Sequence, residues 1–126
     1  MAFPQKPTEK KLVYLDHAAT TYVSDEVKAA MEPFFIDQFA NPSGLYAIGR
    51  EVNGALNDAR RSVAEILHAL PDTIIFTGSG TESDNMAIFG VARKHADKGK
   101  HIITTKIEHH AVLHPCEQLE KEGFEV

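Results

Sequence analysis

Residues 73–85 read Thr-Ile-Ile-Phe-Thr-Gly-Ser-Gly-Thr-Glu-Ser-Asp-Asn, and the rest of the chain is organised around this stretch. Its first five residues are mostly β-branched or aromatic, a composition typical of a buried strand. Residues 78–80, Gly-Ser-Gly, then end the strand, because glycine permits backbone angles closed to other residues and lets a ligand approach the main chain. Thr81, with Asp84 three residues later, predicts the capped start of a helix. Strand, glycine turn and helix N-terminus together predict an anion site, and phosphate is the usual occupant.

The alternative for the same pattern is an ordinary tight turn between a strand and a helix. Two standard phosphate motifs are absent from the sequence. There is no Gly-x-x-x-x-Gly-Lys-Ser/Thr, and the glycines lack the Gly-x-Gly-x-x-Gly spacing. A nucleotide P-loop and a dinucleotide fingerprint are therefore excluded as explanations of the turn.

Composition limits the class of protein. The 126 residues are 43% hydrophobic and 25% charged, which is typical of one globular domain. The formal charge of −5, without a basic stripe, argues against nucleic acid as a partner. No apolar run reaches the roughly 20 residues that cross a bilayer, and the N-terminus has no hydrophobic signal core. With a single cysteine, Cys116, the chain is expected to be cytoplasmic and to have no membrane partner.

The chain before residue 45 contains one helix between loops. Residues 1–11 are polar and contain two prolines, so we expect a loose arm, and residues 12–15 are expected to form a short strand. The small, hydrogen-bonding residues 16–21 are typical of a turn that lines a cavity. Ser24 is expected to cap a helix whose apolar residues at helical spacing form one buried face. Pro33 should kink or end that helix.

The later segments alternate between helix and strand. Residues 41–44, Asn-Pro-Ser-Gly, are a loop, and apolar residues at helical spacing predict a long amphipathic helix over 45–70. A helix is expected from Thr81 to about Lys98, followed by a strand at 100–105.

After a turn at 108–110, a helix is expected to carry Leu113, Cys116 and Leu119 inward. Gly123 is a suitable residue for its C-terminal cap, and 124–126 begin another strand.

From Thr73 onward the order of strand and helix predicts a parallel sheet, with 73–77 and 100–105 as adjacent strands. Ligands bind at the carboxyl ends of strands in such sheets. The turns at 78–81 and 108–110 should therefore face one crevice. A sheet of three strands has an unpaired edge, so we expect this chain to be a piece of something larger.

Four motifs in this order resemble the cysteine desulfurases of the NifS/IscS type, which belong to the class V aminotransferase group. They are Tyr14-Leu15-Asp16-His17-Ala18-Ala19-Thr20-Thr21, Asn41-Pro42-Ser43, Phe76-Thr77 with Thr81-Glu82-Ser83-Asp84-Asn85, and Glu108-His109. The resemblance implies pyridoxal 5'-phosphate as cofactor and the aspartate aminotransferase-like α/β fold (fold type I), with a mainly parallel sheet and flanking helices. It also implies a single incomplete domain, in which residues 1–22 are an arm and small-domain segment and 23–126 begin the large cofactor-binding domain.

The resemblance further implies an activity and a role for each matched residue. Such an enzyme removes sulfur from L-cysteine, giving L-alanine and an enzyme persulfide for iron–sulfur cluster assembly or other sulfur transfer. It is a homodimer that meets sulfur-acceptor or scaffold proteins. Gly80 and Thr81 would hold the cofactor phosphate, and His109 would stack on the pyridine ring and assist proton transfer. The substrate side of the cleft would be lined by Asp16, His17, Ala18, Ala19, Thr20, Asn41, Pro42 and Ser43.

The family's Schiff-base lysine and nucleophilic cysteine have no counterpart in these 126 residues, so we expect the isolated chain to be inactive. Cys116 is not that cysteine, because its helical spacing places it beside Leu113 and Leu119 as a structural thiol. One alternative is a non-catalytic fragment or interaction module. The other is a zinc site, for which His110 and His114 stand at i, i+4 with His109, Glu108 and Cys116 nearby. Pro115 disturbs that geometry, so no metal is expected.

Overall fold

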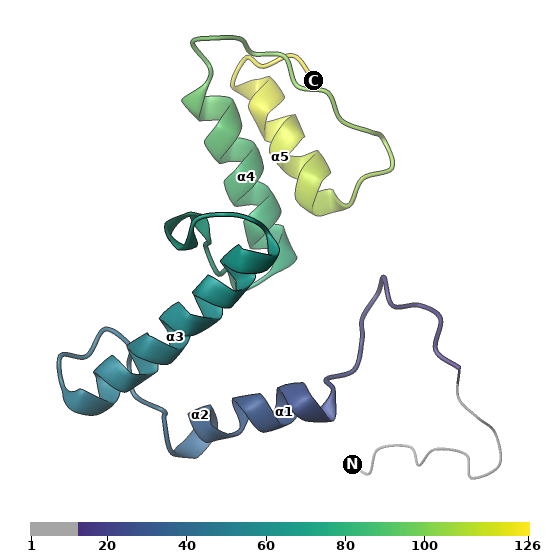
Figure 1. The fold of residues 1–126 in the computed structure, drawn as a ribbon. Coiled ribbons are helices and arrows are strands. Elements are labelled where there is room, and N and C mark those ends of the chain that lie inside the picture. The colour runs from purple at the N-terminus through teal and green to yellow at the C-terminus, as the bar shows by residue number, and fades with distance from the viewer. Residues whose placement is uncertain (1–12) are drawn as a thin grey trace. The chain divides into compact units, whose positions relative to one another are not determined.

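The computed structural model describes residues 13–126, which form two compact units (Figure 1). The first unit extends to Ser62, and the second is Val63–Val126. The predicted arm at 1–11 and the residue Leu12 lie outside the described residues. The division of the chain into 1–22 and 23–126 stays a prediction.

The first unit begins without regular structure and continues into two short helices. The strand expected at 12–15 does not form over the described residues of that range. The helix α1, Asp25–Met31, begins where predicted, and the Ser24 hydroxyl accepts the N–H of Val27 at 3.3 Å. Pro33 ends it as expected and opens α2, Pro33–Ile36. The expectation of a buried face is wrong, because within the described residues no element covers these side chains: Phe35 is 70% exposed.

The long helix α3, Ala47–Ile66, confirms the periodicity of residues 45–70, although it is shorter at both ends. The turn before it requires glycine at position 49, where a Cβ atom would lie 2.6 Å from the Gly44 carbonyl oxygen. The apolar stripe is only partly covered: Leu45 and Ile66 at its ends are 90% and 78% exposed, whereas Ile48, Val52 and Val63 are partly buried. Neither α3 nor any other helix within residues 13–126 is both long and apolar enough to cross a membrane.

The second unit begins with the last residues of α3 and continues into a short 3₁₀ helix, Pro71–Thr73, where the strand expected at 73–77 should start. Ile74 is extended, but residues 74–77 belong to no strand. The bridge found over the described residues, between His101 and Glu125, does not involve this segment.

The helix α4, Gly80–Lys94, starts one residue earlier than predicted, and its cap differs from the expected one. Ser79 is the N-cap, and its hydroxyl accepts the N–H of Glu82 at 3.2 Å. The Glu82 carboxylate accepts the N–H of Gly78 at 2.6 Å. The cap is therefore built from Ser-x-x-Glu, and Thr81 with Asp84 is not the pair that starts the helix. Neither Gly78 nor Gly80 has a positive φ, so the turn does not use the conformational freedom expected of them.

The helix α5, His110–Lys121, packs against α4 and carries most of the small core. Cys116 and Leu119 are buried as predicted, and Leu119 is completely shielded from solvent. The helix ends on Gly123, whose φ of +87° is a left-handed conformation. The N–H groups of Gly123 and Phe124 donate to the carbonyls of Glu120 and Leu119, both at 3.0 Å. These two bonds form a Schellman motif, which confirms the predicted glycine cap.

The predicted parallel sheet is not shown by the structure. In the part of the chain that it describes, the only β-pairing is one parallel bridge between His101 and Glu125. The Ile102 N–H donates to the Glu125 carbonyl, and the Glu125 N–H donates to the Lys100 carbonyl, both at 2.8 Å. Residues 100–102 thus have one parallel neighbour, which α5 connects to them along the chain. The pairing expected between 73–77 and 100–105 is absent. A strand is stabilised by a series of hydrogen bonds to a neighbouring strand, and over the described residues this pairing is limited to one bridge.

Candidate functional site

Two helix N-termini meet at one pocket in the second unit. The helices α4 and α5 lie side by side and begin at the same end of the pair (Figure 1). The pocket has a volume of about 290 Å³. It is lined by Thr81, Asn85, His109, His110, Ala111, His114 and Pro115. Because each helix N-terminus carries roughly half a positive charge, the pocket favours an anion.

The N-terminus of α4 has free backbone donors at Thr81, which lines this pocket, and at Gly80 directly before it. The cap Ser79 accepts the N–H groups of Glu82, through its hydroxyl, and of Ser83, through its carbonyl. The N–H groups of Gly80 and Thr81 have no partner within residues 13–126. A Cβ atom added at Gly80 would meet nothing within 4 Å, so a ligand can reach this backbone. Two N–H groups and the Thr81 hydroxyl are the donor set for an oxyanion.

His109 is the N-cap of α5, and its ring is held by the backbone of the same turn. Its Nδ1 accepts the N–H of Ala111 at 3.1 Å, so Nδ1 carries no proton in this arrangement. The neutral imidazole then carries its proton on Nε2. The neighbouring rings of His110 and His114 stack with their centroids 4.9 Å apart. The ring of His109 therefore has one nitrogen in use as a cap and one N–H to offer to a ligand.

Asn85 was not singled out as a site residue from the sequence, yet it joins the two helices at the pocket. Its side-chain amide donates to the Thr81 carbonyl at 2.8 Å and to the Ala111 carbonyl at 3.3 Å. The signal that could have revealed it is Pro115, since a proline inside a helix leaves a carbonyl one turn earlier without its donor.

The residues predicted from the sequence fall into two groups. Thr81 and His109 line the same pocket, and Gly80 precedes Thr81 at the start of α4. The segments 16–20 and 41–43 belong to the first unit, and their place beside a substrate stays a prediction.

Both segments of the first unit are turns, as expected. The Ala19 N–H donates to the Asp16 carbonyl at 3.1 Å, and His17 Nδ1 lies 3.3 Å from the Thr21 hydroxyl. The Ser43 N–H donates to the Asn41 side-chain oxygen at 2.9 Å. Asp16, His17, Ala18, Ala19, Thr20, Asn41 and Ser43 are exposed, and Pro42 is partly buried.

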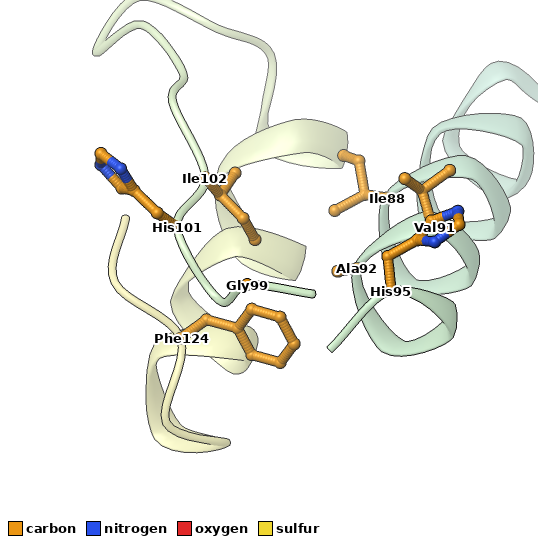
Figure 2. Close-up of a pocket in the computed structure, with 8 residues that line it drawn as sticks. All are labelled: Ile88, Val91, Ala92, His95, Gly99, His101, Ile102 and Phe124. Atoms are coloured by element: carbon orange, nitrogen blue, oxygen red, sulfur yellow. The ribbon is translucent and has the colours of Figure 1, made fainter. Parts of the chain in front are cut away.

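A second hollow of the same unit is apolar and has a volume of about 250 Å³. Figure 2 shows the side chains of Ile88 and Ile102 and the ring of Phe124 around it. Aliphatic and aromatic groups dominate this lining, so it offers few groups for bond-making chemistry. It lies towards the C-terminal half of α4, away from Thr81.

Two further expectations concern cysteine and metal. Cys116 is 4% exposed, and this burial raises the pKa of its thiol, with a smaller contribution from the charge of Glu120. A buried thiol with a raised pKa is a poor nucleophile. Across residues 13–126, no group of three or more His, Cys, Asp or Glu side chains is arranged to hold a metal ion.

Comparisons with known proteins give one consistent family. The family model described as aminotransferase class-V matches residues 13–126. The chain is 56% identical over 117 residues to a protein named cysteine desulfurase IscS from Dictyoglomus turgidum, covering 93% of this chain and 30% of that relative. The chain thus spans about 30% of the length of the curated relatives it matches.

Two solved structures are similar to this one. A NifS-like protein aligns with a TM-score of 0.83 and 39% identity, over 90% of this chain and 31% of the other. A structure described as SspA in complex with cysteine aligns with a TM-score of 0.80 and 42% identity, over 90% of this chain and 33% of the other.

Proposed function

This chain belongs to the class-V aminotransferase family, and from that premise we propose that it is part of a cysteine desulfurase whose cofactor phosphate is bound where α4 and α5 begin. The observation that carries the proposal is the meeting of Thr81 and His109 at one pocket, from two helix N-termini. The cofactor is pyridoxal 5'-phosphate, which acts as an electron sink for reactions of amino acids when it is bound.

The residues present fit the phosphate of this cofactor. The unpartnered N–H groups of Gly80 and Thr81, the Thr81 hydroxyl and the open space beside Gly80 supply donors and access. Two helix dipoles oriented towards one pocket stabilise a dianion further. Gly80 and Thr81 therefore bind and orient the phosphate.

His109 acts on the other side of the same pocket. Its ring is available for stacking on the pyridine ring, and its turn is fixed because Nδ1 accepts the Ala111 N–H. The proton that His109 can supply is the one on Nε2, since Nδ1 is occupied by the backbone. His109 thus orients the cofactor and holds a proton at a defined atom.

The substrate and the partners come to this chain by similarity. The substrate is L-cysteine, which a structural relative binds according to its description. The turns 16–20 and 41–43 line the substrate side, and the complete protein is a cytoplasmic homodimer with the parallel sheet of fold type I. It gives its sulfur to acceptor or scaffold proteins that serve iron–sulfur cluster assembly or other sulfur transfer. Support for these statements is the identity to proteins named cysteine desulfurase IscS.

These 126 residues alone bind the cofactor without turning over L-cysteine. None of the side chains that line the pocket of Thr81 and His109 is a lysine or a cysteine. The pocket therefore has neither an amine for covalent attachment nor a thiol to accept sulfur.

The test uses pyridoxamine phosphate, whose lack of an aldehyde prevents imines with surface lysines. The change Thr81→Ala removes one hydroxyl donor to a charged group, so we expect about tenfold weaker binding by calorimetry. The matched control is Thr104→Ala, because Thr104 does not line this pocket and the affinity should not change. Equal affinity of all three proteins, or no binding to the wild type, would contradict the proposal.

A further inference from the structure

The carbonyl of Ala111 has lost its helical donor. In an α-helix the N–H of residue 115 would bond to the carbonyl of residue 111. Residue 115 is proline, which has no N–H, and it lies inside α5. Ala111 is 5% exposed, so water is largely kept from it. A buried carbonyl without a partner is destabilising and needs a donor from elsewhere.

Asn85 of α4 supplies that donor. Its Nδ2 lies 3.3 Å from the Ala111 carbonyl and 2.8 Å from the Thr81 carbonyl one turn earlier in its own helix. An amide nitrogen has two hydrogens, and each has one acceptor here. The opposite orientation of the amide would place its oxygen against two carbonyl oxygens, so the geometry selects the orientation described.

The other polar group of Ala111 is bound to His109. The Ala111 N–H donates to His109 Nδ1 at 3.1 Å, while the Ala111 carbonyl accepts from Asn85. A continuous path of three hydrogen bonds therefore runs from Thr81 through Asn85 and Ala111 to His109. Its two ends are the residues that contact the ligand in the proposed function.

We propose that Asn85 is a positioning residue, which uses the carbonyl released by Pro115 to hold the first turn of α5, with His109 in its Nε2–H tautomer, beside Thr81. The importance of Asn85 for catalysis rests on the proposed function. The hydrogen-bond path from Thr81 to His109 is independent of it. Asn85 acts through Ala111 and need not touch the substrate.

The first measurement concerns the wild-type chain without any ligand. Long-range ¹H–¹⁵N spectra of the 126-residue chain at neutral pH should show His109 with an unprotonated Nδ1 and a protonated Nε2. A proton on Nδ1 of the neutral ring would overturn the proposal, because that nitrogen could not then accept the Ala111 N–H.

The second measurement removes the donor. Asn85→Ala should speed hydrogen exchange of the Ala111 amide about fivefold, the effect of one neutral hydrogen bond, and should mix the two tautomers of His109. Asn85→Asp keeps the shape and loses both donors, so it should act in the same direction. The matched controls are Asn57→Ala and Asn57→Asp. The Asn57 side chain bonds to Asn53 and Arg60, which both lie on α3, so these changes should leave both signals unchanged.

The third measurement tests the part of Pro115. The change Pro115→Ala gives the Ala111 carbonyl a helical N–H again, which makes the Asn85 donor redundant. Asn85→Ala should then change Ala111 exchange less than about twofold, so the two sites should be coupled in a double-mutant cycle. An equal effect of Asn85→Ala on Ala111 exchange with Pro115 and with alanine at this position would overturn the proposal. Unchanged His109 signals in both Asn85 variants would also overturn it.

Binding of pyridoxamine phosphate distinguishes a failure of this proposal from a failure of the proposed function. Asn85→Ala should weaken pyridoxamine phosphate about fivefold if His109 is mispositioned. If the wild type binds no pyridoxamine phosphate, the proposed function fails, while the tautomer and exchange data still decide the role of Asn85. If the wild type binds and Asn85→Ala binds equally well, the positioning role is refuted.

Discussion

Gly123→Ala should destabilise the second unit by forcing an L side chain into a left-handed turn. The φ of Gly123 is +87°, and this region costs a residue with a Cβ about 1–2 kcal/mol. The added Cβ would have no neighbour nearer than Lys100 Nζ at 4.0 Å, so collision adds little to that figure. The equilibrium constant for local unfolding of the C-terminal end of the second unit should rise by a factor of about 5–30.

The destabilisation should be largest in the segment that follows the turn and in the residues that bond to it. Gly123 allows the Phe124 N–H to bond to the Leu119 carbonyl, which buries both side chains. It also places Glu125 where its backbone bonds to Lys100 and Ile102, on either side of its bridge partner His101. Amide hydrogen exchange at Phe124, Glu125 and Ile102 should therefore accelerate more than exchange in α3.

Gly90→Ala is the matched control in the same unit. Gly90 lies in the interior of α4, and a Cβ there would meet nothing within 4 Å. Alanine should stabilise this helix by up to about 1 kcal/mol and slow the exchange of its amides. If Gly123→Ala were neutral or stabilising like Gly90→Ala, the reasoning from the left-handed turn would be refuted.

Three further predictions concern reactivity, acid and activity. Because burial raises the pKa of Cys116, less thiolate is present at any given pH, so iodoacetamide should alkylate it more slowly than in the urea-unfolded chain; equal rates would contradict this. The hydrogen bonds from Arg93, at 2.7 and 3.0 Å, lower the pKa of Glu122, so this pair stabilises the contact of α4 with α5 above the ordinary glutamate pKa, and the contribution is lost as the pH falls through the lowered value. Glu122→Gln should remove that part of the acid sensitivity, and an unchanged acid profile would show that the pair contributes nothing. The pure 126-residue chain should release no L-alanine from L-cysteine with pyridoxal 5'-phosphate, and robust production would mean that another group replaces the attachment lysine.

The helices could be predicted from the sequence because their signals are local. Ser24 and Pro33 fix the bounds of α1, and Gly123 ends α5, through interactions within a few residues. The start of α4 was placed wrongly by one residue, and its cap was misassigned, although Ser79 and Glu82 have the spacing of a capping box. Ser79 and Thr81 both carry a hydroxyl near the start of α4, and only the geometry shows that Ser79 is the N-cap.

The strands and the buried faces could not be predicted in the same way, because they depend on partners distant in the sequence. Residues 73–77 have the composition of a strand, but composition does not supply the neighbouring ladder. Within residues 13–126, only the segment 100–102 has a parallel neighbour, at Glu125. The sequence predicts the apolar stripes of α1 and α3, yet their full burial requires a covering surface that residues 13–126 do not provide.

The site was predicted in part. The turns at 78–81 and 108–110 were expected to share a crevice, and Thr81 and His109 do line one pocket. That expectation rested on a parallel sheet, whereas the structure achieves the same juxtaposition through the packing of α4 on α5. The role of Asn85 was missed because it follows from a carbonyl released by Pro115, and this consequence appears only when the two helices are placed together.

The central claim is that the N-termini of α4 and α5 bind the phosphate and ring of the cofactor, and a paired titration tests it most directly. The ¹⁵N-labelled chain is titrated with pyridoxamine phosphate and, separately, with pyridoxamine, which lacks the phosphate. The account predicts that the NMR signals of the Gly80 and Thr81 amides and of the His109 ring shift with pyridoxamine phosphate. With pyridoxamine, the amide signals of Gly80 and Thr81 should not shift. Identical shifts with both compounds, or shifts confined to residues outside this pocket, would contradict it.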